Sequence, residues 1–192
     1  MRSLPTDNSK NKQPPEAETT FAAGDAIPKL NLAKLEAARR GTPAVDAAWR
    51  TALVGLLNDS LATELVCVLR YKRHHYTAHG LASPRIAEEF MVHALEETTH
   101  ADRIAKRIVQ LGGEPDFEPE SLSRRSHAAY DASPDLKSMI RANLVAENVA
   151  VEAYGQLVAL IGERDPTTRR LIEDILADEQ KHADELQGWL TT

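Results

Sequence analysis

Two short segments of the chain each place a glutamate and a histidine three positions apart. The first pair is Glu97 and His100 in "EETTHADR", and the second is Glu179 and His182 in "DEQKHADE". Residues i and i+3 lie on one face of an α-helix, so each pair can direct a carboxylate and an imidazole at one metal ion. These ligands suit iron or manganese better than copper. A single pair is also consistent with a solvated helix face.

A lone glutamate precedes each pair at almost the same distance. Glu64 lies 33 residues before Glu97 (97 − 64), and Glu147 lies 32 residues before Glu179 (179 − 147). The sequence thus repeats one unit twice, with Glu on one helix and Glu-x-x-His on the next. This set is typical of di-iron or di-manganese carboxylate sites inside four-helix bundles. Four ionised glutamates balance two divalent cations, whereas without metal such buried carboxylates repel one another.

Two acidic residues are placed to orient the histidines. Glu96 and Asp178 each stand directly before the glutamate of a Glu-x-x-His pair. A metal-bound histidine usually donates its second ring N–H to a carboxylate. If the two halves of the chain face each other, Asp178 can accept from His100 and Glu96 can accept from His182.

Other candidate residues have two interpretations each. Tyr71 lies seven residues after Glu64 on the same helix stripe. It is either a partner of a metal ligand that can also donate an electron, or an ordinary core tyrosine. His93, one turn before Glu97, is an extra metal contact or, as we favour, a core or solvated histidine. Three more histidines close one helix, where they can favour the helix dipole: His74, His75 and His79.

Four long helices are expected to position these residues. Ser or Asp before Pro marks helix starts, and Gly marks helix ends. The expected helices run from about Pro43 to His79, from Ser83-Pro84 to Gly112-Gly113, from Ser133-Pro134-Asp135 to about Gly162, and from Asp165-Pro166 to about Trp189. The first and third connections are short, which predicts two antiparallel hairpins. The second is about 20 residues long, enough to cross the bundle. The predicted fold is therefore all-α, a ferritin-like four-helix bundle.

Composition limits the other possibilities. The net charge of −6 argues against a nucleic-acid binder. Cys67 is the only cysteine, which excludes an internal disulfide and favours a reducing compartment, so we expect a cytoplasmic protein. No secretory signal and no membrane span are expected. Residues 1–28 are predicted to be a disordered tail, residues 29–42 a short helical lead-in, and residues 43–192 the bundle.

The chain resembles the bacterioferritin-like branch of the ferritins. The resemblance covers about residues 45–190 and is carried by "LNDSLATELVCVLRY", "EETTHADRIAKRIVQLGGEPDF", "NLVAEN" and "EDILADEQKHADEL". It implies two iron ions per subunit, oxidation of Fe(II) by O2 or H2O2, and storage of Fe(III) as mineral in a hollow shell. It also implies that the first iron is held by Glu64 and His100, the second by Glu147 and His182, and both by the bridging Glu97 and Glu179.

Three departures from that branch matter. Thr98 stands where haem-binding members have Met directly after the first bridging glutamate, so no haem is expected. Ten residues follow His182, too few for the fifth helix of 24-subunit cages. The length of the middle connection is more similar to that in Dps-like proteins, whose twelve-subunit cages protect DNA from oxidants. We therefore expect a homo-oligomer, most simply a 12-mer cage, although Dps sites lie between subunits and lack the doubled ligand set.

Several alternatives remain open from sequence. A manganese catalase uses a closely similar site to dismutate peroxide. A Dps-like protein that binds DNA would have to use the N-terminal tail, against the acidic net charge. Rubrerythrin-type peroxidases are disfavoured because their four-cysteine iron domain is missing. A purely structural bundle leaves the doubled ligand set unexplained. The metal, the oxidant and the size of the assembly are not fixed by the sequence.

Overall fold

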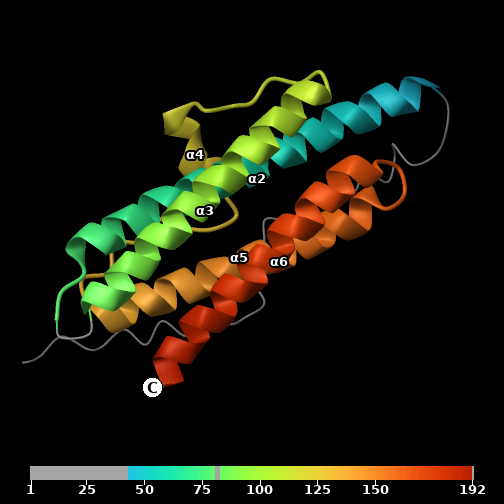
Figure 1. Cartoon of the computed structure of the whole chain (residues 1–192). Helices are drawn as coiled ribbons and strands as arrows, with labels where there is room; N and C mark the ends of the chain where they lie inside the picture. Colours follow the sequence, from blue (N-terminus) through green and yellow to red (C-terminus); the bar gives the residue numbers. More distant parts are fainter. Residues whose placement is uncertain (1–42, 81–82, 192) are drawn as a thin grey trace, which may run out of the picture.

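The computed structural model describes residues 43–80 and 83–191 of the 192-residue chain. In these ranges the chain forms five helices and no strand, with four long helices side by side and a short one against the outside (Figure 1). The helices are α2 (Pro43–Thr77), α3 (Ser83–Gln110), α4 (Pro119–Arg125), α5 (Leu136–Ile161) and α6 (Pro166–Thr191). The predicted all-α bundle is confirmed. The predicted tail and lead-in lie outside the described residues, so the proposed division of the chain stays a prediction.

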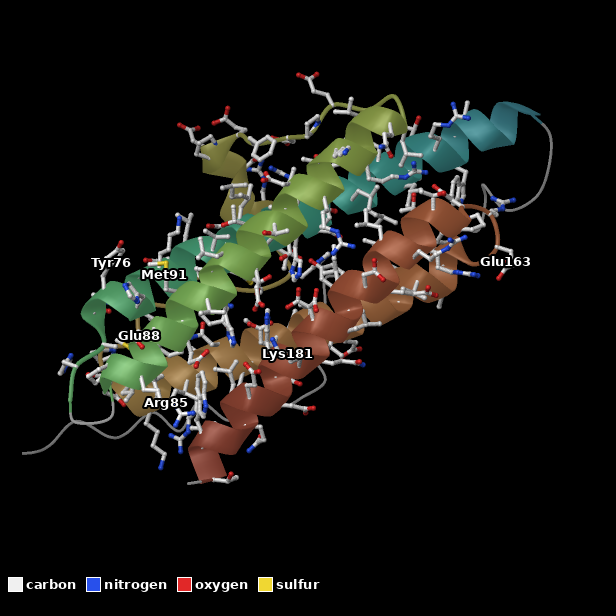
Figure 2. The ribbon with its side chains drawn as sticks, viewed as in Figure 1. Tyr76, Arg85, Glu88, Met91, Glu163 and Lys181 are labelled. Carbon is white, nitrogen blue, oxygen red and sulfur yellow. The ribbon has the colours of Figure 1, made fainter. Side chains whose placement is uncertain are left out.

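The four long helices form two antiparallel hairpins. Helix α2 packs along α3, and α5 packs along α6, while α2 also meets α5 and α3 meets α6. Side chains fill the space between the two hairpins (Figure 2). The predicted ends of the helices are confirmed to within a few residues. At the end of α5, for example, Gly162 has a φ of 52° and its N–H donates to the Val158 carbonyl, a conformation that glycine adopts without strain.

The third long helix has its N-cap two residues after the predicted Ser133 (135 − 133). Helix α5 begins at Leu136, and its N-cap is Asp135, whose carboxylate accepts the N–H of Ser138 at 3.0 Å. Ser133 instead uses its N–H to close a turn on the Asp131 carboxylate at 2.8 Å. Asp135 competes with Ser133 for the capping role, and the Ser-Pro pattern alone does not reveal which residue caps the helix.

The connection between the hairpins is structured and lies along α2. It contains α4, which sequence patterns missed because one or two turns carry too little periodicity. Arg125 donates to the Asn58 carbonyl at 2.8 Å and to the Asp116 carbonyl at 2.9 Å. The backbone N–H of His127 donates to the Thr63 hydroxyl at 2.9 Å. Hydrogen bonds of this kind hold the crossover against the first hairpin.

Two apolar layers lie on either side of a polar middle. One layer includes Leu57, Ile104 and Ile172, and the other includes Phe90 and Met139. On every long helix, the predicted metal ligands fall between the residues of the two layers: Glu64, Glu97, His100, Glu147, Glu179 and His182. Apolar packing on both sides stabilises the bundle and leaves the polar residues in a region closed to solvent.

In the part of the chain that the structure describes, two helices are long and apolar enough to cross a membrane by length and composition alone, Ala47–Thr77 and Leu136–Ile161. Sequence analysis expected no such segment, because it counted uninterrupted apolar runs and not average hydropathy. Both are central helices of the bundle, and each carries a buried glutamate that faces the other hairpin, Glu64 and Glu147. We therefore assign them to the core of the four-helix fold.

Candidate metal centre

The six residues predicted as metal ligands meet in the middle of the bundle. They form two overlapping groups, in each of which the ligand atoms lie within 4.8 Å of one another. Glu97 and Glu179 belong to both groups. All six side chains are buried, and none belongs to a residue more than 2% exposed. The first group adds Glu64 and His100, and the second adds Glu147 and His182.

Each histidine turns the same ring nitrogen toward the carboxylates. His100 Nδ1 lies 3.0 Å from Glu97 Oε2 and 3.2 Å from Glu179 Oε1. His182 Nδ1 lies 3.4 Å from Glu97 Oε1 and 3.7 Å from Glu179 Oε2. The centre therefore has two halves, each with one histidine, that share the same two glutamates.

Several atoms of the centre lack hydrogen-bond partners. Among the described residues, the buried unpaired atoms include Glu97 Oε1, Glu147 Oε2, Glu179 Oε1 and His182 Nδ1. A buried carboxylate oxygen without a partner costs several kcal/mol in general. The donor set of four carboxylates and two imidazoles fits two divalent cations of the iron or manganese type. These residues can therefore hold the metals that the sequence pattern predicts.

Burial sets the charges of the metal-free centre. It raises the pKa of Glu64 to about 8, with help from the nearby charge of Glu97, and likewise raises the pKa of Glu179. Burial also opposes ionisation of Glu97, but its close contacts with His100 and His182 outweigh burial and hold the pKa of Glu97 below its usual range. The surrounding carboxylates likewise raise the pKa of both histidines against the effect of burial. Protons thus partly neutralise the centre when metal is absent.

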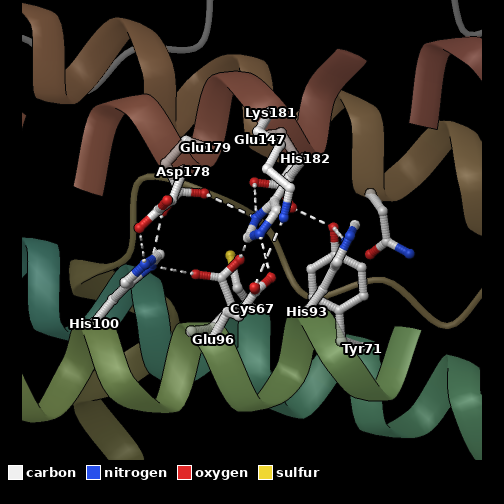
Figure 3. A network of polar contacts seen from close by, with 12 residues as sticks. Cys67, Tyr71, His93, Glu96, His100, Glu147, Asp178, Glu179, Lys181 and His182 are labelled. Atoms are coloured by element: carbon white, nitrogen blue, oxygen red, sulfur yellow. Dashed lines mark hydrogen bonds and ion pairs between the residues drawn. The ribbon is translucent and has the colours of Figure 1, made fainter. Parts of the chain in front are cut away.

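The predicted orienting contacts are confirmed. His100 Nε2 lies 3.2 Å from Asp178 Oδ2, and His182 Nε2 lies 2.8 Å from Glu96 Oε2 (Figure 3). A carboxylate at Nε2 keeps a proton on that nitrogen, so Nδ1, which faces the centre, is the nitrogen that would bind a metal. Both contacts join one hairpin to the other.

Two tyrosines donate hydrogen bonds to Glu64 and Glu147, the glutamates that belong to only one ligand group each. The Tyr71 hydroxyl donates to Glu147 Oε1, and the Tyr154 hydroxyl donates to Glu64 Oε1. Both are fully buried, and burial raises the pKa of each phenol. Sequence analysis gave contact with a ligand as one of two interpretations of Tyr71, and it missed Tyr154. The signal was present, since Tyr154 follows Glu147 by seven residues as Tyr71 follows Glu64.

Comparison with known protein families decides the assignment. The family model for the ferritin-like domain matches residues 54–192, well over half of the chain. The chain belongs to the ferritin-like family.

The chain is similar to several individual proteins of this family. It is 30% identical over 134 residues to a bacterioferritin of Desulfovibrio desulfuricans, covering 68% of this chain and 69% of that protein. It resembles the solved dodecameric thioferritin, a bacterioferritin-related protein of Bacteroides fragilis, with a TM-score of 0.72 and 30% identity over 74% of this chain and 86% of the other. A Dps protein of Vibrio cholerae matches with a TM-score of 0.70 at 20% identity, covering 73% of this chain and 90% of the other, and shows the shared fold alone.

The other histidines of this ferritin-like chain have different surroundings. His93 is fully buried, and its ring stacks on His182 with 4.1 Å between centroids. His74 is also buried, which lowers its pKa to about 4, so it is neutral at pH 7 and contributes no charge to the helix dipole. His75 and His79 contact backbone carbonyls close to the start of α3 and the end of α2, at 2.6 Å and 3.0 Å.

A buried arginine next to the centre went unnoticed in the sequence. Arg70 is completely buried and donates to Asn143 Oδ1 at 2.8 Å, to the Ala129 carbonyl at 3.1 Å and to Cys67 Sγ at 3.2 Å. Its partners come from α2, α5 and the crossover, which it holds together. Burial raises the pKa of the Cys67 thiol well above its ordinary value.

Proposed function

We propose that the chain is a cytoplasmic ferroxidase and iron-storage protein. It oxidises Fe(II) with O2 or H2O2 at a two-metal site within each subunit and keeps the Fe(III) as mineral inside a protein shell. One observation carries this proposal: four ligand atoms of the centre are buried without hydrogen-bond partners, on Glu97, Glu147, Glu179 and His182. The relatives named bacterioferritin and thioferritin support the same reading.

The ligand groups suggest how the two ions are shared. Glu64 and His100 belong only to the first group, and Glu147 and His182 only to the second. Glu97 and Glu179 belong to both and are therefore the proposed bridges. All six residues come from one chain, so each subunit would carry a complete centre.

Two Fe(II) ions held side by side can give two electrons to one molecule of oxidant. The surrounding residues would prepare the centre for its substrate. The hydroxyls of Tyr71 and Tyr154 keep the carboxylates of Glu147 and Glu64 oriented. The carboxylates of Asp178 and Glu96, at the Nε2 atoms of the two histidines, fix the tautomers of the imidazoles. Binding of the cations displaces the protons that burial retains on Glu64 and Glu179. The apolar layers keep bulk water away.

The test is a Glu97→Ala substitution in the full-length protein, with Glu88→Ala on the exposed side of the same helix as the matched control. Stopped-flow absorption after mixing with Fe(II) and O2 measures the oxidation rate. We expect rapid oxidation to be lost in Glu97→Ala and kept in Glu88→Ala. The metal-free Glu97→Ala protein should be less stable, because Glu97 is the ionised partner of His100 and His182 in the buried centre. An unchanged oxidation rate in Glu97→Ala overturns the proposal.

A second candidate function rests on the same donor set. Carboxylates and imidazoles suit manganese as well as iron, so the centre can also support peroxide dismutation of the manganese catalase type. Metal analysis of protein from cells supplied with both metals separates the two candidates. Bound manganese and steady O2 release from H2O2 favour the catalase, whereas bound iron and O2 uptake on adding Fe(II) favour the ferroxidase.

A further inference from the structure

The two hairpins repeat the centre almost residue for residue, but the repeat fails at two aromatic positions. His93 stands four residues before the glutamate of its Glu-x-x-His pair, where the other hairpin has Ile175. Trp189 stands seven residues after the histidine of its pair, where the other hairpin has Arg107. One side of the centre thus carries two aromatic rings that the other side lacks.

These two rings continue a stack that begins at a predicted metal ligand. The ring of His93, on α3, stacks on that of His182, on α6, with 4.1 Å between centroids and 20° between planes (Figure 3). His93 also stacks on Trp189, with 6.2 Å between centroids and 15° between planes. His93 and His182 are fully buried, whereas Trp189 is partly exposed near the end of α6. Three nearly parallel rings therefore lead from the centre to the surface.

The charges beside the stack favour the movement of an electron from Trp189 toward the centre. Such a movement leaves a transient positive charge on the rings, and indole gives up an electron more easily than imidazole does. His93 Nε2 lies 3.0 Å from Glu185 Oε2, and His182 Nε2 lies 2.8 Å from Glu96 Oε2. Carboxylates this close to the rings lower the energy of a positive charge on them.

Tyr71 is the competing electron donor. It is fully buried, and its ring meets that of His93 edge-on, with 5.1 Å between centroids. Its hydroxyl donates to Glu147, so its proton already lies inside the centre. A radical on Trp189 would instead lie at the surface, where solvent can accept the indole proton and a reductant in solution can return the electron. Trp189 is therefore the better final position for the radical.

We infer that Trp189 supplies an electron to the centre, through His93 and His182, when H2O2 meets a centre that holds a single Fe(II). The O–O bond of H2O2 breaks, and two electrons and two protons convert the peroxide into two molecules of water. One electron comes from Fe(II), which becomes Fe(III), and the other comes from the indole, whose N–H proton passes to solvent. This role rests on the proposed function.

A second Fe(II), in solution, then restores the tryptophan. It gives one electron to the indolyl radical, which regains a proton from solvent, and it becomes Fe(III). The sum is the oxidation of two Fe(II) by one H2O2. Without the second electron from the protein, one Fe(II) would reduce H2O2 to hydroxide and a free hydroxyl radical. The stack thus prevents release of that radical when the centre is half filled.

The test begins with full-length protein that holds less than one Fe(II) per chain without O2. H2O2 is added, the reaction is frozen rapidly, and the radical is recorded by electron paramagnetic resonance. We expect a tryptophan radical, identified by the narrower signal of protein made with ring-deuterated tryptophan. The signal should be lost in Trp189→Phe. The matched control is Trp49→Phe, which removes the only other tryptophan, a buried residue of an apolar layer, and should keep the signal.

A His93→Ile variant tests the path, because it copies the other hairpin and interrupts the stack while Trp189 remains. Peptide mass spectrometry measures oxygen added to Trp189 after exposure to H2O2, and a spin trap measures hydroxyl radical in solution. We expect less oxidation of Trp189 and more trapped hydroxyl radical in His93→Ile. Attack on the exposed indole by radicals from solution predicts more oxidation of Trp189 instead. Unchanged oxidation of Trp189 in His93→Ile overturns the inferred path.

Stopped-flow oxidation of Fe(II) by H2O2, with at least two Fe(II) per unmodified chain, tests the proposed function separately. Rapid oxidation without a tryptophan radical in the half-filled protein overturns the inference and leaves the proposed function intact. A radical that survives in Trp189→Phe does the same. Absence of Fe(II) oxidation overturns the proposed function and the inference with it.

Discussion

Glu64 gives the metal-free protein a defined pH dependence. Burial, with the charge of Glu97, raises its pKa from 4.5 to about 8. Between these values the folded protein binds a proton that the unfolded chain releases, so this group stabilises the fold at low pH and its contribution is lost as the pH rises through about 8. We expect the unfolding free energy of chelator-treated protein, measured in urea, to fall less steeply with pH over this range in Glu64→Gln than in the unmodified protein. Equal slopes in the two proteins contradict the raised pKa.

Thr98 underlies the prediction that no haem is bound. Its hydroxyl donates to the Ala94 carbonyl of its own helix at 2.7 Å and offers no thioether to iron. Protein produced with haem supplied should show no Soret band in its absorption spectrum. A Thr98→Met variant prepared in parallel isolates the effect of the thioether. A strong Soret band in the unmodified protein contradicts the prediction.

Residues whose role depends on spacing were predictable, and those whose role depends on tertiary contacts were not. The two Glu-x-x-His pairs and the acids before them have fixed offsets, so their convergence and the Asp178 and Glu96 contacts follow from helix geometry. Tyr154 has an equally regular offset from Glu147, so its contact with Glu64 could have been inferred by the argument used for Tyr71. Arg70 gives no such signal, since its partners include a carbonyl of the crossover, whose course the sequence does not define.

At the scale of elements, Gly113 tests how tightly the end of α3 packs on α2. A Cβ at this position would meet Val54 Cγ1 at 2.5 Å and Ile108 Cγ2 at 3.2 Å. The Val54 side chain is stiff, so Gly113→Ala should destabilise the fold by about 1–3 kcal/mol in urea unfolding. Gly55→Ala, in the exposed middle of α2 with nothing within 4 Å, should instead stabilise it by about 0.5–1 kcal/mol. A neutral Gly113→Ala result contradicts the close packing.

Sequence signals located the long helices because each has a strong start, a glycine near its end and many turns between. They failed where the signals compete or the element is short. Ser133 and Asp135 both can cap a helix, and only the structure shows that the Asp135 side chain does so. Helix α4 depends on hydrogen bonds from Arg125 to distant carbonyls, which no local pattern encodes.

At the scale of the whole molecule, we predict a closed assembly of twelve chains. A mineral store needs an enclosed volume, which a single bundle lacks, and closed symmetry is the usual way for one chain to enclose it. The solved relative at 30% identity is dodecameric. Large apolar side chains remain exposed on α2 and α3, including Leu69, Tyr76 and Leu95, and subunit contacts would cover such surfaces.

Light scattering coupled to size exclusion checks this prediction. The expected mass is about twelve times the 21.2 kDa of one chain. About twenty-four times that mass indicates the larger cage. A stable monomer or dimer contradicts storage and leaves a soluble two-metal oxidase or catalase as the better assignment.

Four hydrogen-bond contacts that orient the metal ligands cross from one hairpin to the other. Each hairpin supplies one tyrosine and one acid that serve the ligands of its neighbour: Tyr71 and Glu96 act on Glu147 and His182, and Tyr154 and Asp178 act on Glu64 and His100. A hairpin of this kind complements a rotated copy of itself. Duplication and fusion of one ancestral hairpin would therefore produce the whole centre at once.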